Sequence, residues 1–219
     1  MINYKIVFLV LFMSTSQVNA VTFSGNTAGL FGNDSTLLEW GVGFGGSSSL
    51  LYESADTFSE DDGIPFKIAT LTYNNTEITP DSDFAATFLE PTLHATVIIG
   101  SGISSGETSV ILGGASIVDA DLTIIETDNN SSNPSDTVSL LLSDEDISVF
   151  SLNGADYTFK LLGFKNSSGD FDNFFIQPEN SNSPVDLYAE ITAVPIPSAV
   201  WLFITAFTGL LALNNRRAV

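Results

Sequence analysis

Short runs in which apolar and polar residues alternate dominate the middle of this 219-residue chain. Successive side chains of a strand point to opposite faces, so a run with a period of two buries one face and exposes the other. The middle has no stretch of ten or more residues with a convincing 3.6-residue period and helix caps. Strands are therefore predicted at residues 38–44, 66–73, 93–99, 109–112, 118–124, 138–142, 147–152, 157–164, 173–176 and 185–191.

Residues that favour turns separate these runs. Asn153-Gly154 predicts a tight hairpin, because both residues accept positive φ. Loops are also predicted at residues 45–49, 74–75 and 180–184, which are rich in Gly, Ser and Asn. About ten closely spaced strands with charges on one face predict an all-β fold, an antiparallel two-sheet β-sandwich of jelly-roll-like type. A closed barrel is the alternative.

The first twenty residues have the three parts of a secretory signal. Lys5 supplies a positive start, and residues 6–13 are all apolar. Val18-Asn19-Ala20 places small or modest residues before a cleavage site, so cleavage is predicted between Ala20 and Val21. The apolar run is too short to span a bilayer. Residues 1–20 are therefore interpreted as a signal peptide removed by signal peptidase.

The last residues form an apolar segment bounded by characteristic polar residues. Pro195 and Pro197 precede it, Trp201 lies near its start, and Arg216-Arg217 follow it. Proline is tolerated at a helix start, and tryptophan favours the membrane interface. Two arginines favour the cytoplasmic side. The segment is short for a span of about 20 residues. It is therefore predicted to be a hydrophobic helix that acts as a marginal anchor or a removable sorting signal.

These residues resemble the PEP-CTERM sorting tail of Gram-negative bacteria. Residues 194–203 match the variant Val-Pro-x-Pro-x-Ala-Val-Trp-Leu-Phe, although Ile196 stands where the name-giving motif has glutamate. The resemblance implies processing by an exosortase near Pro195 and Pro197. It also implies transit through the inner membrane towards the cell surface. A plain tail anchor is the alternative reading.

The middle of the chain resembles the exported choice-of-anchor domains of bacteria, the K type most closely. The matching stretches are Phe23-Ser24-Gly25, Glu39-Trp40-Gly41 and the run from Gly63 to Asn74. The resemblance implies an exported β-rich domain without assigned active residues. Three parts are therefore predicted: a signal peptide at 1–20, an exported domain at 21–192 and a sorting tail at 193–219.

All 26 acidic residues lie between the two ends, where the only basic residues are Lys67, Lys160 and Lys165. Such a surface repels nucleic acid and attracts cations. The chain has no cysteine, which excludes thiol nucleophiles and cysteine-based zinc sites. His94 is the only histidine, and it stands in an alternating run with no Gly-x-Ser-x-Gly motif in the chain. A non-enzymatic protein is predicted, with a hydrolase using His94 as the least favoured reading.

Calcium is the ligand that the acidic loops favour, because it prefers six to eight hard oxygen ligands. Asp170 and Asp172 are the first candidates, since they stand two residues apart in a loop before an aromatic run. The sequence as a whole predicts an exported cell-surface or extracellular-matrix protein of structural or adhesive type, in contact with surface polysaccharide. A calcium- or carbohydrate-binding module is the alternative.

Overall fold

The computed structural model of the chain describes residues 21–32, 35–43, 46–55, 57–77, 88–89, 92–100, 115–127, 134–142, 147–152, 154–195 and 205–206. The elements among them are strands, and every pair of strands is antiparallel: β1 (Thr22–Phe31), β2 (Leu37–Gly43), β3 (Gly46–Ser54), β4 (Phe58–Asp61), β5 (Phe66–Asn75), β6 (Phe88–Leu89), β7 (Thr92–Gly100), β8 (Ala115–Ile125), β9 (Ser135–Leu141), β10 (Ile147–Leu152), β11 (Ala155–Lys165), β12 (Phe171–Asp172), β13 (Phe174–Pro178) and β14 (Ser181–Ala193). The prediction of an all-β, antiparallel protein is confirmed.

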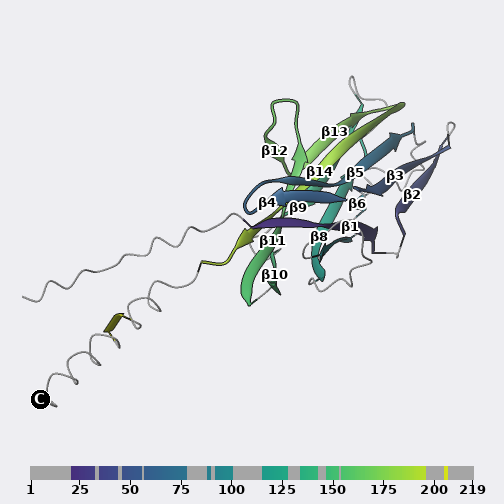
Figure 1. Ribbon diagram of the computed structural model, residues 1–219. Coiled ribbons are helices and arrows are strands. Elements are labelled where there is room, and N and C mark those ends of the chain that lie inside the picture. Colours follow the sequence, from purple (N-terminus) through teal and green to yellow (C-terminus); the bar gives the residue numbers. More distant parts are fainter. Residues whose placement is uncertain are drawn as a thin grey trace, which may run out of the picture.

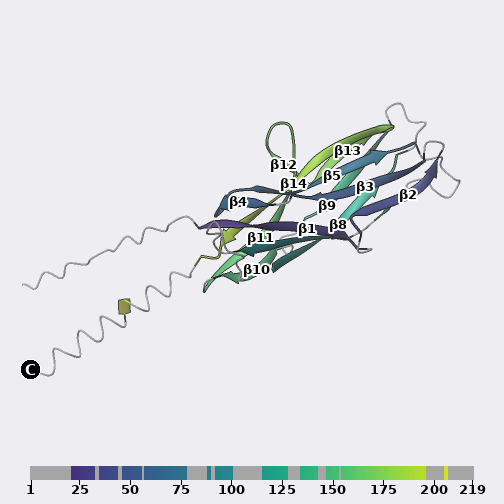
Figure 2. The ribbon, with the colours of Figure 1, turned by 45° about the vertical axis from the view of Figure 1, so that its right-hand side comes forward.

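The strands form two seven-stranded sheets. The first has the order β13-β9-β8-β7-β1-β4, with β6 paired to β8. The second has the order β10-β11-β14-β5-β3-β2, with β12 paired to β11. Figure 1 labels these strands, and Figure 2 shows them running along the long axis of the two-sheet body, a name used here for residues 21–195. The chain changes sheet at each step from β12 to β14, so β13 and β14 lie in different sheets.

The predicted alternation reappears as alternating burial. Ala120, Leu122 and Ile124 of β8 are buried, whereas Asp119 and Asp121 are exposed. The hairpin predicted at Asn153-Gly154 joins β10 to β11, and the ladder between these strands starts with Leu152 opposite Ala155. Gly154 has a φ of 80° there. The strand predicted at residues 109–112 lies outside the described residues.

The predicted loops at residues 46–49, 74–75 and 181–184 are wrong, because these residues belong to strands. Their polar side chains suggested turns, but their backbones are paired in the ladder: Ser181 with Asn75, Asn182 with Asn74, and Asn74 with Ser49. Neighbouring strands satisfy each other's backbone hydrogen-bonding groups. This pairing outweighs the turn preference of single side chains.

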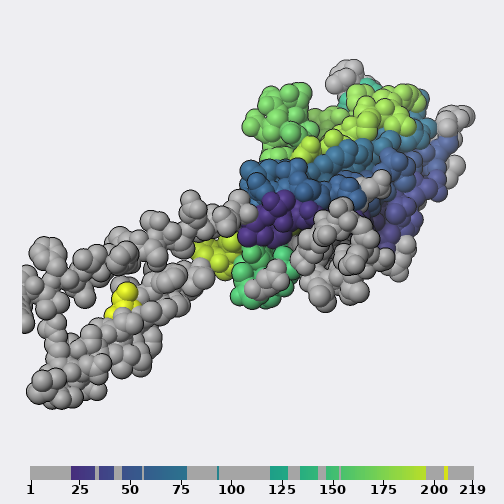
Figure 3. Space-filling view, viewed as in Figure 1, coloured from purple at the N-terminus to yellow at the C-terminus, as the bar shows by residue number. Residues whose placement is uncertain are grey.

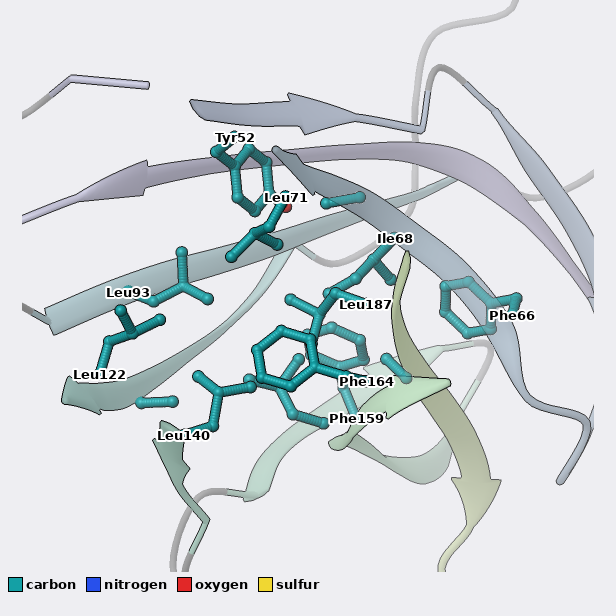
Figure 4. Packing of buried hydrophobic residues seen from close by; sticks show 14 of the residues in the cluster. Tyr52, Phe66, Ile68, Leu71, Leu93, Leu122, Leu140, Phe159, Phe164 and Leu187 are labelled. Carbon is teal, nitrogen blue, oxygen red and sulfur yellow. The ribbon is translucent and has the colours of Figure 1, made fainter. Parts of the chain in front are cut away.

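Buried side chains of both sheets form one hydrophobic core. Figure 4 shows ten of them by name, pointing toward one another from strands of the two sheets: Tyr52, Phe66, Ile68, Leu71, Leu93, Leu122, Leu140, Phe159, Phe164 and Leu187. Aromatic rings pack edge to face in this core, as Phe164 does on Phe175 with centroids 4.9 Å apart. Burial of these rings and aliphatic chains is the main favourable contribution to folding.

Gly29 on β1 leaves the space that Tyr52 of the facing sheet fills. A Cβ atom at Gly29 would lie 2.3 Å from Cζ of Tyr52, whose hydroxyl donates to the carbonyl of Ala28 at 3.3 Å. We expect Gly29→Ala to lower the free energy of unfolding by about 1–3 kcal/mol, because the ring must move and the core has little free volume. Urea unfolding measures this change. An unchanged midpoint would contradict the tight contact between Gly29 and the ring of Tyr52.

The first strand, β1, begins at the same end of the two-sheet body at which the last strand, β14, ends. The amide of Asp62 donates to the carbonyl of Val21 at 3.0 Å, and the carboxylate of Asp62 accepts from the amide of Ala193 at 2.8 Å. Figure 3 shows the purple start of β1 beside the yellow-green end of β14 on the surface. The first and last residues of the exported domain predicted from sequence therefore lie at the same end of the two-sheet body, next to Asp62.

The predicted signal peptide, including Ala20, lies outside the described residues. So do Pro197, Trp201, Arg216 and Arg217 of the predicted sorting tail, while Val21 and Pro195 are described and exposed. No helix within the part of the chain that the structure describes has the length and hydrophobicity needed to cross a bilayer.

Candidate metal centre

Three carboxylates from separate parts of the chain meet where β8, β9 and β13 end or begin. Glu126 directly follows β8, Asp136 is the second residue of β9, and Glu179 lies in the turn from β13 to β14. One carboxylate oxygen of each lies within 4.8 Å of the others. We call these three residues the acid cluster. Among the described residues, it is the one group of three or more carboxylate, histidine or cysteine side chains close enough to share a metal ion.

Asp136 is the fixed member of the acid cluster. Its side chain has no exposed surface, and its Oδ2 accepts from the Tyr73 hydroxyl at 2.6 Å. Its Oδ1 accepts from the amide of Thr127 at 2.8 Å and from the hydroxyl of Thr127 at 3.2 Å. The Thr127 hydroxyl in turn accepts from the amide of Ser135 at 2.9 Å. Three donors therefore hold one buried carboxylate in place, as a buried charge requires.

Glu126 lies against two aromatic side chains from the other sheet. Its Oε1 accepts hydrogen bonds from Nε1 of Trp40 and, at 3.3 Å, from the Tyr73 hydroxyl. The rings of Trp40 and Tyr73 stack with centroids 5.4 Å apart. Trp40 is on β2 and Tyr73 on β5, so these bonds join the acid cluster to the second sheet.

Glu179 contributes a carboxylate that has no hydrogen-bond partner among the described residues. Both of its side-chain oxygens are inaccessible to solvent and accept no hydrogen bond within the described part of the chain. Its backbone amide donates to the carbonyl of Pro134 at 3.3 Å, which ties the turn to the segment before β9. Asn180 next to it has a φ of 55°, a left-handed conformation that asparagine tolerates in tight turns.

Asn75 brings a further unpartnered oxygen to this end of the body. Its side chain is 1 % exposed and is on the same face of β5 as Tyr73. The amide nitrogen of Asn75 donates to the carbonyl of Gln177 at 3.0 Å, two residues before Glu179. Its Oδ1 has no hydrogen-bond partner among the described residues.

The close approach of the carboxylates changes their acidity. Burial raises the pKa of Glu126 to about 8, and hydrogen bonding and repulsion from Asp136 add to the effect. Burial also raises the pKa of Glu179 to about 7, with repulsion from Asp136 and Glu77. Burial, with the bond to Asp136, raises the pKa of Tyr73, so its hydroxyl stays protonated and donates to Asp136.

No lysine or arginine in the described part of the chain neutralises the acid cluster. The ion pair that the structure describes joins Lys67 to Asp186 at 2.6 Å on the surface. Three carboxylates without a cationic side chain must share protons or bind a cation. In chemical terms, the arrangement offers hard oxygen ligands of the kind that calcium prefers.

The structure places the two predicted calcium ligands elsewhere. Asp170 is exposed in the loop before β12, and Asp172 is half-buried on β12. The side-chain Nδ2 of Asn166 donates to Oδ2 of Asp172 at 2.9 Å. Oδ1 of Asn166 accepts from the backbone amide of Asp170 at 3.0 Å. No third acidic or histidine ligand joins them among the described residues. Calcium binding at Asp170 and Asp172 stays a prediction.

The backbone of His94 pairs with Leu30 of β1 and Asp119 of β8, in the middle of the first sheet. None of the residues of the acid cluster was singled out from the sequence. The sequence matches no protein-family model and no curated protein. The fold and the site define the chain as an antiparallel all-β protein with a partly buried acid cluster, whose hydrogen bonds join its two sheets.

Proposed function

We propose that this chain is an exported, non-enzymatic protein of the bacterial cell surface or extracellular matrix, with a structural or adhesive role. The observation that carries the proposal is the common exit of both chain ends beside Asp62. A C-terminal tail that engages a membrane or a sorting enzyme would then leave the opposite end of the body free. β14 is 13 residues long, so that opposite end lies roughly 40 Å away at about 3.3 Å per residue.

We also propose that the two-sheet body is a β-sandwich of jelly-roll-like type, which suits a stable domain outside the cell. One core joins the two sheets, and 26 acidic residues against six basic ones keep such a protein soluble outside the cell. The polyanionic surface disfavours nucleic acid as a partner. Surface polysaccharide is the partner class that the exported location suggests.

Sorting is the second part of the proposal. The segment from Pro195 to Arg217 would act as a PEP-CTERM-type tail, cut by an exosortase during transit through the inner membrane, while signal peptidase removes residues 1–20. Exposure of Pro195 just beyond β14 supports it, because a protease needs an accessible extended segment next to a folded domain.

We expect protein recovered from the producing bacterium to lack both ends. Intact-mass spectrometry of the envelope and medium fractions measures this, and the N-terminal residue should be Val21. Deleting residues 196–219 should move the protein from the envelope to the medium or periplasm without unfolding it. Recovery of the unprocessed chain in the cytosol would contradict export, and recovery of the intact C-terminus in the inner membrane would contradict cleavage and support a plain anchor.

A further inference from the structure

We propose that Glu126, Asp136 and Glu179 bind a calcium ion that joins the two sheets at the end of the body opposite the chain ends. This site differs from the predicted pair Asp170 and Asp172, and it goes beyond the proposed surface role. The first argument is geometric. Calcium lies about 2.3–2.6 Å from its oxygen ligands, so ligands on opposite sides of one ion are about 4.6–5.2 Å apart. Carboxylate oxygens that all lie within 4.8 Å of one another can therefore contact the same ion.

The second argument is the unsatisfied oxygens. The carboxylate of Glu179 is inaccessible to solvent and has no donor within the described part of the chain, although it lies next to two other carboxylates. A buried ionised carboxylate without a partner costs several kcal/mol. A cation that accepts its lone pairs removes that cost. Asp136, in contrast, already has its three donors and needs no movement to serve as a ligand.

Asn75 is a candidate for a further ligand from the second sheet. Its side chain is almost completely buried, and its unpartnered Oδ1 is on the face of β5 that carries Tyr73, whose hydroxyl contacts Asp136 and Glu126. Calcium commonly combines carboxylates with neutral amide oxygens. Three carboxylates with an amide oxygen leave room for water, which completes the six to eight ligands that calcium takes.

Calcium fits the position of these ligands better than magnesium does. Magnesium demands near-ideal octahedral geometry at about 2.0–2.1 Å and retains several waters. Here the ligands come from separate segments, at the end of β8, the start of β9 and the turn after β13, and two of them are inaccessible or buried. A ligand set assembled from separate segments suits the larger ion, whose coordination is flexible.

Binding at this place would hold the sheets together. Glu126 directly follows β8 and Asp136 lies on β9, both strands of the first sheet. Glu179 lies in the turn that leads into β14 of the second sheet, whose first residue, Ser181, pairs with Asn75 of β5. An ion bound to all of them would act across the point where the chain leaves the first sheet for the second, which Figure 1 shows at the ends of β13 and β5 away from the chain termini. The turn at Glu179 and Asn180 would gain most of the stabilisation.

The test uses the full chain in detergent micelles, freed of metal with a chelator. Calorimetric titration with calcium chloride should show heat of binding, and calcium at about 100 times its dissociation constant should raise the melting temperature by roughly 5–10 °C. Magnesium at the same concentration should give a smaller rise. Sodium chloride at equal ionic strength should give none. The same rise with sodium would overturn the proposal, because it would show general screening of an acidic protein.

Terbium, a calcium analogue that luminesces when a nearby indole is excited, reports the location. Trp40 contacts Glu126 directly, and Trp201 of the tail is replaced by phenylalanine to leave one indole. Terbium luminescence should appear on binding and disappear on addition of calcium. Luminescence that calcium does not displace would overturn the assignment.

Glu179→Gln is the decisive variant, because the carboxylate makes no hydrogen bond to lose within the described part of the chain. It should weaken calcium binding by at least about tenfold, since even partners outside the ligand shell cost about 10–100-fold. It should also raise the metal-free melting temperature at pH 7.5. Asp170→Asn is the matched control, removing one exposed carboxylate and leaving binding unchanged.

Three outcomes would reject the site. The first is that calcium gives neither heat of binding nor a melting shift with the wild-type protein. The second is that Glu179→Gln binds calcium as tightly as wild type. The third is that the double variant Asp170→Asn with Asp172→Asn loses binding instead. The last result would move the ion to the loop before β12. Failure of this proposal leaves the export proposal untouched, because processing of the chain ends does not depend on the ion.

Discussion

Gly163→Ala is expected to lower the melting temperature by roughly 5–20 °C. Gly163 has a φ of 109°, where a side chain is strained, and its Cβ position lies 2.4 Å from the backbone oxygen of Asp172. The obstacle is backbone and cannot rotate away. It belongs to β12, which pairs with β11 at Phe164 and Lys165. Backbone strain costs about 1–3 kcal/mol and overpacking about 1–3 kcal/mol more, and each kcal/mol corresponds to about 2–4 °C in a chain of this size.

Gly154→Ala separates the two contributions. Gly154 has a φ of 80° in the hairpin between β10 and β11, but nothing lies within 4 Å of its Cβ position. It should therefore show only the cost of the left-handed backbone, about 1–3 kcal/mol. Differential scanning calorimetry of both variants measures the difference. Equal losses of melting temperature would show that the approach of β12 to Gly163 contributes nothing.

Much of the fold could be predicted because the buried residues of most strands recur with a period of two. β8 and β9 alternate as expected, and Val138 and Leu140 of β9 are fully buried. This pattern depends only on local sequence and on the existence of one core, so it does not require knowledge of strand order. The order of strands depends on pairings between residues far apart in the chain, such as Thr70 with Asp186, which are 116 positions apart, and no local pattern encodes them.

Strand ends were predicted poorly because polar residues at the ends of long strands look like turns. Ser181 and Asn182 open β14, and their partners Asn75 and Asn74 close β5. Each of these residues would favour a loop if its partner on the other strand were absent. Only the pairing of the two strands, which local sequence does not reveal, gives these residues an extended backbone. The same reason explains why β3 begins at Gly46 in a stretch of glycine and serine.

One residue of the acid cluster could have been found from the sequence. Asp136 has the same parity as Val138 and Leu140, so it stands on the apolar face of an alternating run, as Asn75 does after Leu71 and Tyr73. A charged residue on a buried face needs partners and marks a candidate site. The other two members, Glu126 and Glu179, follow the ends of strands and resemble any exposed acid. Their approach to Asp136 depends on the pairing of β8 and β13 with β9.

The stability of the metal-free protein is expected to fall as pH rises from 5.5 to 8.5. An ordinary glutamate has a pKa of 4.5, whereas burial raises the pKa of Glu126 to about 8 and that of Glu179 to about 7. The folded protein therefore keeps protons that the unfolded chain has already lost. Their contribution to stability is complete below pH 4.5 and is lost as pH rises through 7 and 8. Ordinary carboxylates, which titrate near pH 4, change little above pH 5.5.

The expected fall in melting temperature is roughly 5 °C or more between pH 5.5 and 8.5. Solvent screening at the partly buried glutamates keeps it below what the full pKa changes would give. The double variant Glu126→Gln with Glu179→Gln should flatten this dependence, because amides bind no protons in this range. His94→Gln is the control, since histidine is the side chain that ordinarily titrates near pH 6.5.

Calcium should reverse the slope. Its ligands are carboxylates in the ionised form, so binding releases the protons of Glu126 and Glu179, and the ion stabilises the folded state more strongly as pH rises. Melting temperatures measured with saturating calcium should therefore stay level or rise between pH 5.5 and 8.5, while those with chelator fall. Parallel curves with calcium and chelator would mean that the protons and the ion do not compete for the same oxygens, and the acid cluster would then not be the calcium site.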